Sequence, residues 1–309
     1  MTYLEETMTE DPYEQFRQEL FAAKLLVDTG VPGLYLRSGT FENIVAGIDR
    51  LVTLAGSDYQ APTLHFPLVM ARSAFEQSDY LRSFPDLMGS IHIFDGGDAE
   101  HAELLQYVED GLDWSTLLRA TDVVLCSAAC HPLYPTCTGE LPATGMRYEI
   151  FGNCFRHEPS IDPARMQAFR QHEFVYLGTP EGAQAHRDDW VERGLALLSK
   201  IGLDAQAVVA NDPFFGRAGR ILAAGQRSAD LKFELVYPIC SVEKPTAIVS
   251  ANLHQDHFSV PFDITTPDGN LAHTACVGFG VERIALALLK AHGLDPATWP
   301  SEVHQALWP

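Results

Sequence analysis

Cys154-Phe155-Arg156-His157-Glu158 is predicted to form one strand, and a loop separates it from a second predicted strand, Arg170-Gln171-His172-Glu173-Phe174. Residues two apart in a strand share a face, so Arg156 and Glu158 point the same way. A hairpin brings Phe174 back beside them. The three side chains provide a cation for a phosphate, an acceptor for an exocyclic amine and a ring that stacks on a purine. The pattern therefore predicts a nucleotide site of the kind that forms adenylates.

Bulk composition sets limits on the class of protein. The chain has 309 residues and is 46% hydrophobic, which is enough for a large core in one or two domains. It has no run of about 18 apolar residues, so a membrane span is not expected. The N-terminus is acidic and has no hydrophobic signal region, which indicates a cytoplasmic protein. Its six cysteines include no Cys-x-x-Cys pair, and most are expected to be small buried residues.

The charge balance disfavours nucleic acid as a partner. The chain has 21 basic and 41 acidic residues, a net charge of −20, whereas a protein that binds a polyanion normally carries a basic surface. One group of cations has little acid between its members and comprises Arg217, Arg220, Arg227 and Lys232. This group is either a local patch for an acidic partner or an ordinary solvated face.

The order of predicted elements indicates an α+β fold. The N-terminal third is expected to be mainly helical, with one helix from Thr40 and another over about 67–77. Strands are expected at 91–94, 122–127, 148–156, 171–177, 231–237, 246–253 and 275–280, and helices at 180–201 and 281–292. Consecutive strands with few crossover helices favour a mainly antiparallel sheet flanked by helices.

Two segments together carry a family resemblance. Phe155-Arg156-x-Glu158 followed by Arg170-x-x-x-Phe174 resembles motif 2 of the class II aminoacyl-tRNA synthetases. Gly278-x-Gly280-Val281-Glu282-Arg283, which leads into an apolar helix, resembles their motif 3. Motif 1, the dimerisation element, is expected at the helix before Tyr80 and the strand region near Pro85. The resemblance implies a homodimer with a helical segment over 1–60, packed on a class II catalytic domain over 61–309.

The resemblance also assigns roles around ATP. It implies that Arg156 holds the α-phosphate and Arg283 the γ-phosphate, with Arg170 reaching the terminal phosphates. Glu158 accepts a hydrogen bond from the adenine amino group, and Phe174 stacks on the base. Arginine suits these phosphate roles because its planar fork matches oxyanion geometry. Taken singly, such Arg–Glu pairs are equally well explained as weak surface ion pairs.

A metal site is the second implication. Cys130, Glu173 and Cys276 look like the zinc ligands of the atypical seryl-tRNA synthetases of methanogens. Two thiolates and a carboxylate leave a fourth tetrahedral position open for the amine of an amino acid. The three residues lie far apart in sequence, so without the resemblance two buried cysteines and an ion-paired glutamate are the favoured interpretation. His131 and His172 flank the ligands and are expected to serve in packing or as partners of the ligands.

A compact, acidic homologue of that catalytic core is similar to the bacterial amino acid:[carrier protein] ligases. These enzymes activate a small amino acid with ATP and load it onto the phosphopantetheine thiol of a carrier protein. The resemblance implies an AMP-forming ligase with one Zn²⁺ per subunit and Mg²⁺ with ATP. It favours glycine or alanine and leaves serine open. Arg217 and Arg220 are candidate contacts for the carrier protein.

The sequence leaves open two alternative functions and the magnesium ligands. A seryl-type aminoacyl-tRNA synthetase is disfavoured by the net charge of −20 and by the missing tRNA-binding domain. A catalytically inactive paralogue is disfavoured because Arg156 and Arg283 are both present. Ser250-Ala251-Asn252 resembles a stretch near the magnesium site of the synthetases, but Thr246 and Ala247 stand where its acid is expected. Glu234 and Glu243 are the remaining candidates for that acid.

Overall fold

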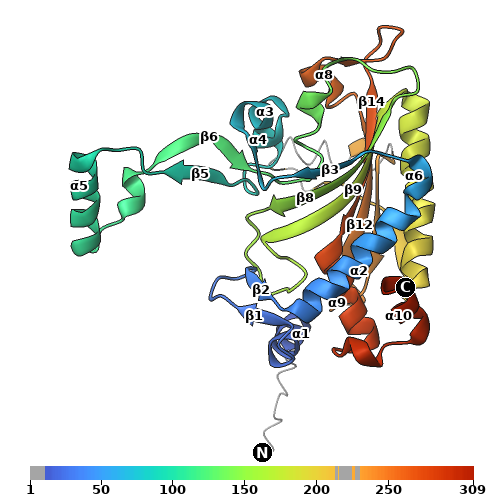
Figure 1. Ribbon diagram of the computed structural model, residues 1–309, viewed down its shortest axis with the longest axis horizontal. Coiled ribbons are helices and arrows are strands. Elements are labelled where there is room, and N and C mark those ends of the chain that lie inside the picture. Colours follow the sequence, from blue (N-terminus) through green and yellow to red (C-terminus); the bar gives the residue numbers. More distant parts are fainter. Residues whose placement is uncertain (1–10, 213–214, 216–224, 227–229) are drawn as a thin grey trace, which may run out of the picture.

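A computed structural model describes residues 11–212, 215, 225–226 and 230–309. Its centre is a seven-stranded sheet with the strand order β10-β11-β12-β14-β9-β8-β3 (Figure 1). Neighbouring strands are antiparallel except β3 and β8, which are parallel. The strands are β3 (Thr63–Phe66), β8 (Met146–Phe155), β9 (Ala168–Gly178), β10 (Gln206–Val209), β11 (Lys232–Tyr237), β12 (Thr246–Gln255) and β14 (His273–Gly280). The predicted α+β fold is confirmed.

Helices cover one face of this sheet. They are α2 (Gly39–Ala55), α6 (Pro180–Lys200), α9 (Val281–His292) and α10 (Ser301–Leu307). Helix α2 begins after Ser38, whose hydroxyl accepts a hydrogen bond from the Phe41 N–H at 3.2 Å. Trp190, Phe279 and Ile284 are fully buried in the core between helices and sheet. The opposite face of the sheet is therefore available for a site.

Smaller elements surround this core. The remaining strands are β1 (Leu26–Asp28), β2 (Tyr35–Arg37), β4 (Val69–Ala71), β5 (Ser90–Ile93), β6 (Arg119–Leu125), β7 (Gly139–Glu140) and β13 (Ile264–Thr265). The remaining helices are α1 (Pro12–Ala22), α3 (Arg72–Gln77), α4 (Tyr80–Ser83), α5 (Asp98–Glu109), α8 (Ser259–Phe262) and the short 3₁₀ turns η1 (Ser57–Tyr59), η2 (Trp114–Leu117), η3 (Tyr134–Thr136) and η4 (Pro296–Thr298). None of the helices in the described part of the chain is long and apolar enough to cross a membrane.

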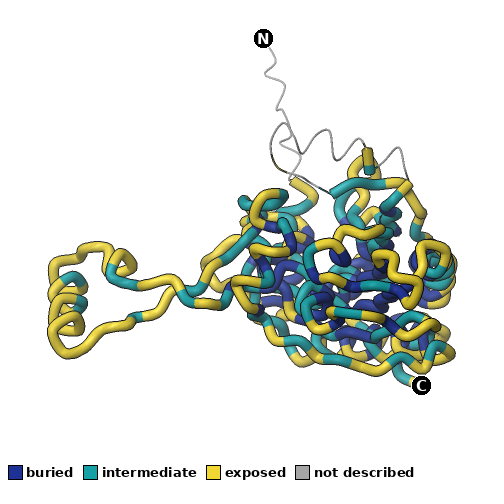
Figure 2. Tube along the Cα trace, turned by 90° about the horizontal axis from the view of Figure 1, so that it is seen from above, coloured by how far each residue is buried: buried dark blue, intermediate teal, exposed yellow. Residues whose placement is uncertain are grey.

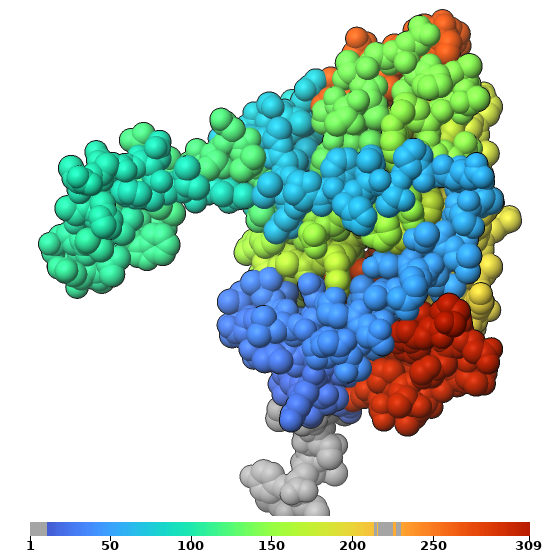
Figure 3. All heavy atoms as spheres, viewed as in Figure 1, coloured from blue at the N-terminus to red at the C-terminus, as the bar shows by residue number. Residues whose placement is uncertain are grey.

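One segment leaves the body of the molecule as an arm. Strands β5 and β6 pair as an antiparallel ribbon and carry α5 and η2 at the far end (Figures 1 and 3). Helix α5 has no buried residue, and Figure 2 shows the end of the arm as mostly exposed. The arm thus contributes little to the core.

The predicted strands and helices of the catalytic core are confirmed within a few residues of their ends, except the strand expected over Cys154–Glu158. That strand ends at Phe155, so Arg156 and Glu158 lie in the loop after β8 and do not share a strand face. The expected helix over 67–77 is wrong in its first part, because residues Val69–Ala71 form β4 and only Arg72–Gln77 are helical. The expected strand near Pro85 is absent, since residues 84–89 form turns and loop before β5 begins at Ser90. The strands predicted at 91–94 and 122–127 are confirmed as β5 and β6, but the sequence pattern did not predict α5 and η2 between them or the β1–β2 hairpin.

A buried polar cluster joins α2 to the sheet. Glu149 accepts hydrogen bonds from Thr53 at 2.5 Å and Thr63 at 2.7 Å, and lies 3.0 Å from Nε2 of His172. The other ring nitrogen of His172 lies 3.2 Å from Asp49 of α2. His172, expected from sequence to flank a metal ligand, points instead to the helix-covered side of the sheet.

This cluster predicts sensitivity to acid. Burial raises the pKa of Glu149, but hydrogen bonds from His172, Thr53 and Thr63 outweigh it and lower the pKa to about 2. A lowered carboxyl pKa adds stability that is complete above its usual value of 4.5 and is lost as the pH falls through about 2. In urea denaturation, the free energy of unfolding should fall more steeply over this range for the wild type than for Glu149→Gln. Parallel pH profiles would contradict this.

Candidate active site

A cleft of about 1260 Å³ opens on the sheet face away from the main helices. Strands β9, β12 and β14 form its floor. Every second residue lines it over residues 169–173 of β9 and 276–280 of β14, as expected for strands with one face toward the cleft. The predicted site residues that line it are Cys130, Arg156, Glu158, Glu173, Cys276 and Arg283. Residues that are scattered over the sequence therefore share one cavity.

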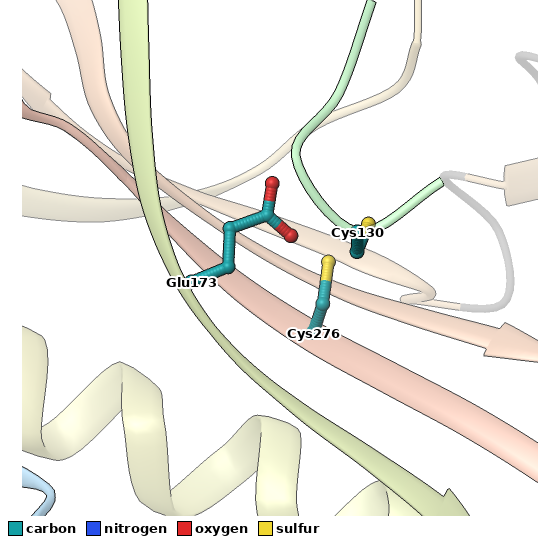
Figure 4. Close-up of side chains that lie close together, drawn as sticks. All are labelled: Cys130, Glu173 and Cys276. Carbon is teal, nitrogen blue, oxygen red and sulfur yellow. The ribbon is translucent and has the colours of Figure 1, made fainter. Parts of the chain in front are cut away.

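The structure brings the three predicted metal ligands together. Their ligand atoms all lie within 4.8 Å of one another, and Figure 4 shows the side chains converging. Glu173 on β9 pairs with Gly278 on β14, two residues from Cys276, so Glu173 and Cys276 are diagonal neighbours on one face. Cys130 comes from the loop after β6.

A second contact fixes the loop that carries Cys130. The side-chain oxygen of Gln171 accepts hydrogen bonds from the Ala129 N–H at 3.0 Å and from the Cys154 thiol at 3.1 Å. Gln171 lies on β9, two residues from Glu173. Strand β9 therefore carries one predicted metal ligand, Glu173, and also anchors the loop that carries another, Cys130. Sequence reasoning did not identify Gln171.

The electrostatics of this cluster fit a metal ion. A hydrogen bond with Cys276, burial and the nearby Glu173 carboxylate raise the pKa of Cys130 well above its usual value. Burial also raises the pKa of Glu173, and its Oε2 is buried without a hydrogen-bond partner among the described residues. Ionising these groups together needs a cation between them, since a metal ion deprotonates a coordinating thiol outright. Two thiolates and one carboxylate form a donor set that suits zinc.

The predicted phosphate-binding arginines lie at fixed positions in the cleft. The Nε of Arg156 donates to the Ser127 carbonyl at 3.0 Å, and its guanidinium lies 5.3 Å from the ring centre of Phe169. Arg283 is at the start of α9, where its Nε donates to Ala164 O and its Nη1 to Ala247 O, both at 2.9 Å. These backbone contacts fix both cations without neutralising either.

The prediction that Phe174 stacks on adenine is contradicted. Phe174 is 2% exposed, and its ring packs on Trp190 with centroids 4.4 Å apart, on the helix-covered side of the sheet. The phenylalanine of β9 that lines the cleft is Phe169, next to Arg156. The two phenylalanines are five positions apart on β9, an odd offset, so their side chains face opposite sides of the sheet.

The sequence contained the correct pattern. The spacing Arg-x-x-x-Phe occurs twice in succession, as Arg165-x-x-x-Phe169 and as Arg170-x-x-x-Phe174. Only the first copy lines the cleft, and Arg165 donates to Glu158 there at 2.9 Å. The signal that separates the copies is the alternation of β9, because Glu173 and Phe174 are adjacent and cannot both face the cleft.

The role predicted for Arg170 is contradicted for the same reason. Its guanidinium makes two hydrogen bonds to Glu42 of α2, at 2.6 and 3.0 Å, and one to Glu282 at 2.6 Å. Its backbone N–H also donates to Glu282, which is 2% exposed. Arg170 therefore ties β9 to α2 and α9 and lies outside the cleft.

Two alanine variants separate these phenylalanines. Phe169→Ala should raise the KM for ATP about fivefold with little change in stability, because a lost aromatic contact costs ~1 kcal/mol. Phe174→Ala should lower the free energy of unfolding by ~3–5 kcal/mol, because it empties a packed core site. Steady-state kinetics at varied ATP and urea denaturation of both proteins check this. A raised KM for ATP in Phe174→Ala together with a large loss of stability in Phe169→Ala would instead support stacking of Phe174 on adenine.

Further polar groups line the same cleft. Lys232 of β11 is 7% exposed and pairs with Asp212 at 2.5 Å and with Glu234 at 3.2 Å. Of the two candidate magnesium ligands, Glu234 lines the cleft with Ser250 and Asn252, whereas Glu243 is exposed outside its lining. The proposed carrier contacts Arg217 and Arg220 lie outside the described residues.

Comparison with known proteins finds relatives over nearly the whole chain. Residues 128–292 match the family described as "tRNA synthetase class II core domain (G, H, P, S and T)". The chain is 41% identical to "Amino acid--[acyl-carrier-protein] ligase 1" of Bradyrhizobium diazoefficiens, over 93% of this chain and 88% of that protein. Ligase 2 of the same organism is 38% identical, over 96% and 88%.

More distant relatives act on tRNA by name. The chain is 28% identical to "Type-2 serine--tRNA ligase" of Methanopyrus kandleri, over 77% of this chain and 49% of that protein. The crystal structure of M. kandleri SerRS with A. aeolicus tRNASec superimposes with a TM-score of 0.80 at 21% identity, over 94% of this chain and 60% of that one. At this identity the likeness concerns the fold.

Proposed function

Because the chain belongs to the amino acid–[acyl-carrier-protein] ligases, which share the class II aminoacyl-tRNA synthetase core, we propose that it activates a small amino acid with ATP and transfers it to a carrier protein. The observation that carries this proposal is the shared cleft. A cluster of two thiols and a carboxylate, suited to hold an amino acid, lies in the same cavity as two half-buried arginines, Arg156 and Arg283, suited to hold ATP.

The first half-reaction joins the amino acid to AMP. An oxygen of the amino acid carboxylate attacks the α-phosphorus of ATP, a new O–P bond forms, and the bond to the β-phosphate breaks to release pyrophosphate. The carboxylate is already ionised at neutral pH, so no general base is needed. The protein supplies orientation and stabilises charge on the phosphoryl oxygens. Arg156 and Arg283 provide the positive charge for this stabilisation. Phe169 packs on the adenine base, and Glu158 accepts a hydrogen bond from the adenine amino group.

The amino acid is held by its amine. Cys130, Glu173 and Cys276 would bind one Zn²⁺ per subunit, which supplies a Lewis-acid site for a neutral α-amino group. This preference excludes hydroxy acids. Mg²⁺ accompanies ATP, and Glu234 is the carboxylate of this cleft best placed to serve it.

The second half-reaction transfers the aminoacyl group to a thiol. The phosphopantetheine thiolate of the carrier attacks the carbonyl carbon, a C–S bond forms, and the C–O bond to AMP breaks. A net charge of −20 disfavours tRNA as the acceptor. The carrier contacts Arg217 and Arg220 stay a prediction, which charge reversal tests: carrier loading should fall while adenylate formation continues.

A homodimer is part of this proposal. Within the described part of the sheet, β3 pairs with β8 alone and is an edge strand. An edge strand presents unpaired backbone groups that another chain can cover. The proposal also divides the chain into a helical segment over 1–60 and a catalytic domain over 61–309. Sedimentation at several protein concentrations tests the dimer, and a monomer throughout would contradict it.

The walls behind the metal ligands favour a small amino acid. Tyr134 and Phe258 stack with centroids 3.9 Å apart, and the ring of His254 meets Phe258 edge-on at 5.0 Å. Tyr134 and Phe258 pack in the cluster that contains Cys130 and Cys276, and His254 contacts Cys276. Phe258 and His254 also line the cleft, so bulky rings border the proposed amino acid site. Glycine or alanine is therefore the proposed substrate.

Widening this wall should change selectivity. Phe258→Ala is expected to improve kcat/KM for valine relative to glycine by ~10–100-fold, because each methylene accepted is worth ~1–3 kcal/mol. The measurement is pyrophosphate exchange with each amino acid in turn. An unchanged ratio in a folded variant would show that another wall sets the size of the substrate.

Exchange of labelled pyrophosphate into ATP tests the proposed first step. Purified protein with ATP, Mg²⁺ and glycine or alanine should incorporate label, and omission of the amino acid should abolish incorporation. Absence of exchange with every amino acid would overturn the proposed activity. Exchange followed by charging of tRNA would favour the seryl-type alternative.

A further inference from the structure

The sulfur of Cys276 has two side-chain nitrogen atoms beside it. The amide nitrogen of Asn252 lies 3.5 Å from Cys276 Sγ, and Nε2 of His254 lies 3.5 Å from the same atom. Both residues belong to β12, and Asn252 is the direct cross-strand partner of Cys276 on β14. The register of the sheet therefore fixes the first contact.

A bulge fixes the second contact. Leu253 pairs with Ala275 and Gln255 pairs with Thr274, so β12 has one extra residue, His254, at this point. Gln255 has a left-handed φ of 55°, which an ordinary ladder does not use. A bulge bends its strand and re-aims a side chain, and bulges are common next to active sites. Here the ring is directed at the sulfur.

The other side of the ring sets which nitrogen carries the proton. His254 Nδ1 lies 3.1 Å from the Thr274 hydroxyl and 3.5 Å from the Tyr134 hydroxyl. Thr274 is completely buried, and a buried hydroxyl needs an acceptor for its proton. With Nδ1 accepting from Thr274, a neutral imidazole carries its hydrogen on Nε2 and donates it to Cys276 Sγ.

We propose that Asn252 and His254 are positioning residues that donate two N–H···S hydrogen bonds to Cys276 and orient its sulfur for the metal ion. Thr274 sets the tautomer of His254. The inference rests on the zinc site of the proposed function and adds the groups that tune it. Such partners of a ligand typically change metal affinity ~10–100-fold when removed.

Zinc affinity measures this role without reference to turnover. Purified full-length variants would be titrated with zinc against a competing chelator. His254→Phe keeps the ring volume and loses the donor, so its zinc Kd should rise ~10–100-fold. His254→Gln keeps an N–H and should recover most of the affinity. His257→Phe is the matched control, because His257 contacts Phe258 and has no contact with Cys276.

Two milder variants guard against a folding defect. Thr274→Val keeps the shape and removes the hydroxyl, and Asn252→Ala removes the other donor; each should weaken zinc binding in the same direction. In the cobalt-substituted protein, the sulfur-to-metal charge-transfer band should shift in His254→Phe and not in His257→Phe. This inference would be overturned, and the metal site would stand, if zinc affinity and band position were unchanged in all three variants, His254→Phe, Thr274→Val and Asn252→Ala. A wild type that binds no zinc would overturn the metal site itself, and this inference with it.

Discussion

Cys130→Ala and Cys276→Ala are expected to bind no zinc and to lose amino-acid-dependent pyrophosphate exchange almost completely. Each variant removes one of the three ligand atoms that lie within 4.8 Å of one another. A site with one thiolate and one carboxylate holds zinc weakly, and the amine of the amino acid then has no partner in the cleft. Zinc per subunit, measured by elemental analysis after dialysis, should fall from one to near zero in both variants.

Cys137→Ala is the matched control for these variants. Cys137 is also buried in the cluster that contains Cys130, but it lies outside the trio. This control should keep its zinc and its exchange activity while losing a similar amount of packing. Full zinc content in both Cys130→Ala and Cys276→Ala would contradict the metal site, whatever their activity.

Arg156→Ala is expected to lower kcat/KM for pyrophosphate exchange by ~10²–10³-fold, the usual loss when one preorganised donor to a developing charge is removed. The structure fixes this guanidinium through Ser127 O and the Phe169 ring. In the proposed reaction this cation is therefore in place before ATP binds, so its loss should affect the transition state most. The measurement is exchange at varied ATP concentration.

Arg156→Lys separates charge from geometry. Lysine keeps the charge but lacks the planar fork, so an intermediate loss is expected. Arg72→Ala is the control, because Arg72 is exposed and its ion pair with Glu76 lies on α3, outside the lining of the cleft. If Arg156→Ala is folded and its activity is close to that of the wild type, Arg156 has no role in the reaction.

Most of the catalytic core could be predicted from the sequence, because its strands are long and strongly patterned. The strand that ends at Phe155, just before Arg156, and the apolar helix after Gly280 both have their predicted places. The arm could not be predicted in the same way. Helix α5 buries nothing, so its sequence lacks the apolar periodicity that identifies a helix packed on a core.

The candidate site was predicted in part. Cys130, Glu173 and Cys276 come from a loop and two strands, and only the pairing of β9 with β14 brings the last two together. Spacing alone gives no such information. The error at Phe174 had a local cause, since the repeated Arg-x-x-x-Phe spacing offered two registers and strand alternation allows one.

Mass spectrometry of the carrier protein tests the proposed function most directly. The purified protein would be incubated with ATP, Mg²⁺, glycine or alanine, and carrier protein with or without its phosphopantetheine arm. The proposal predicts a mass increase of one aminoacyl group on the carrier with the arm, reversed by hydroxylamine, and none on the carrier without it. An unmodified carrier with every amino acid, together with aminoacylated tRNA under the same conditions, would contradict it.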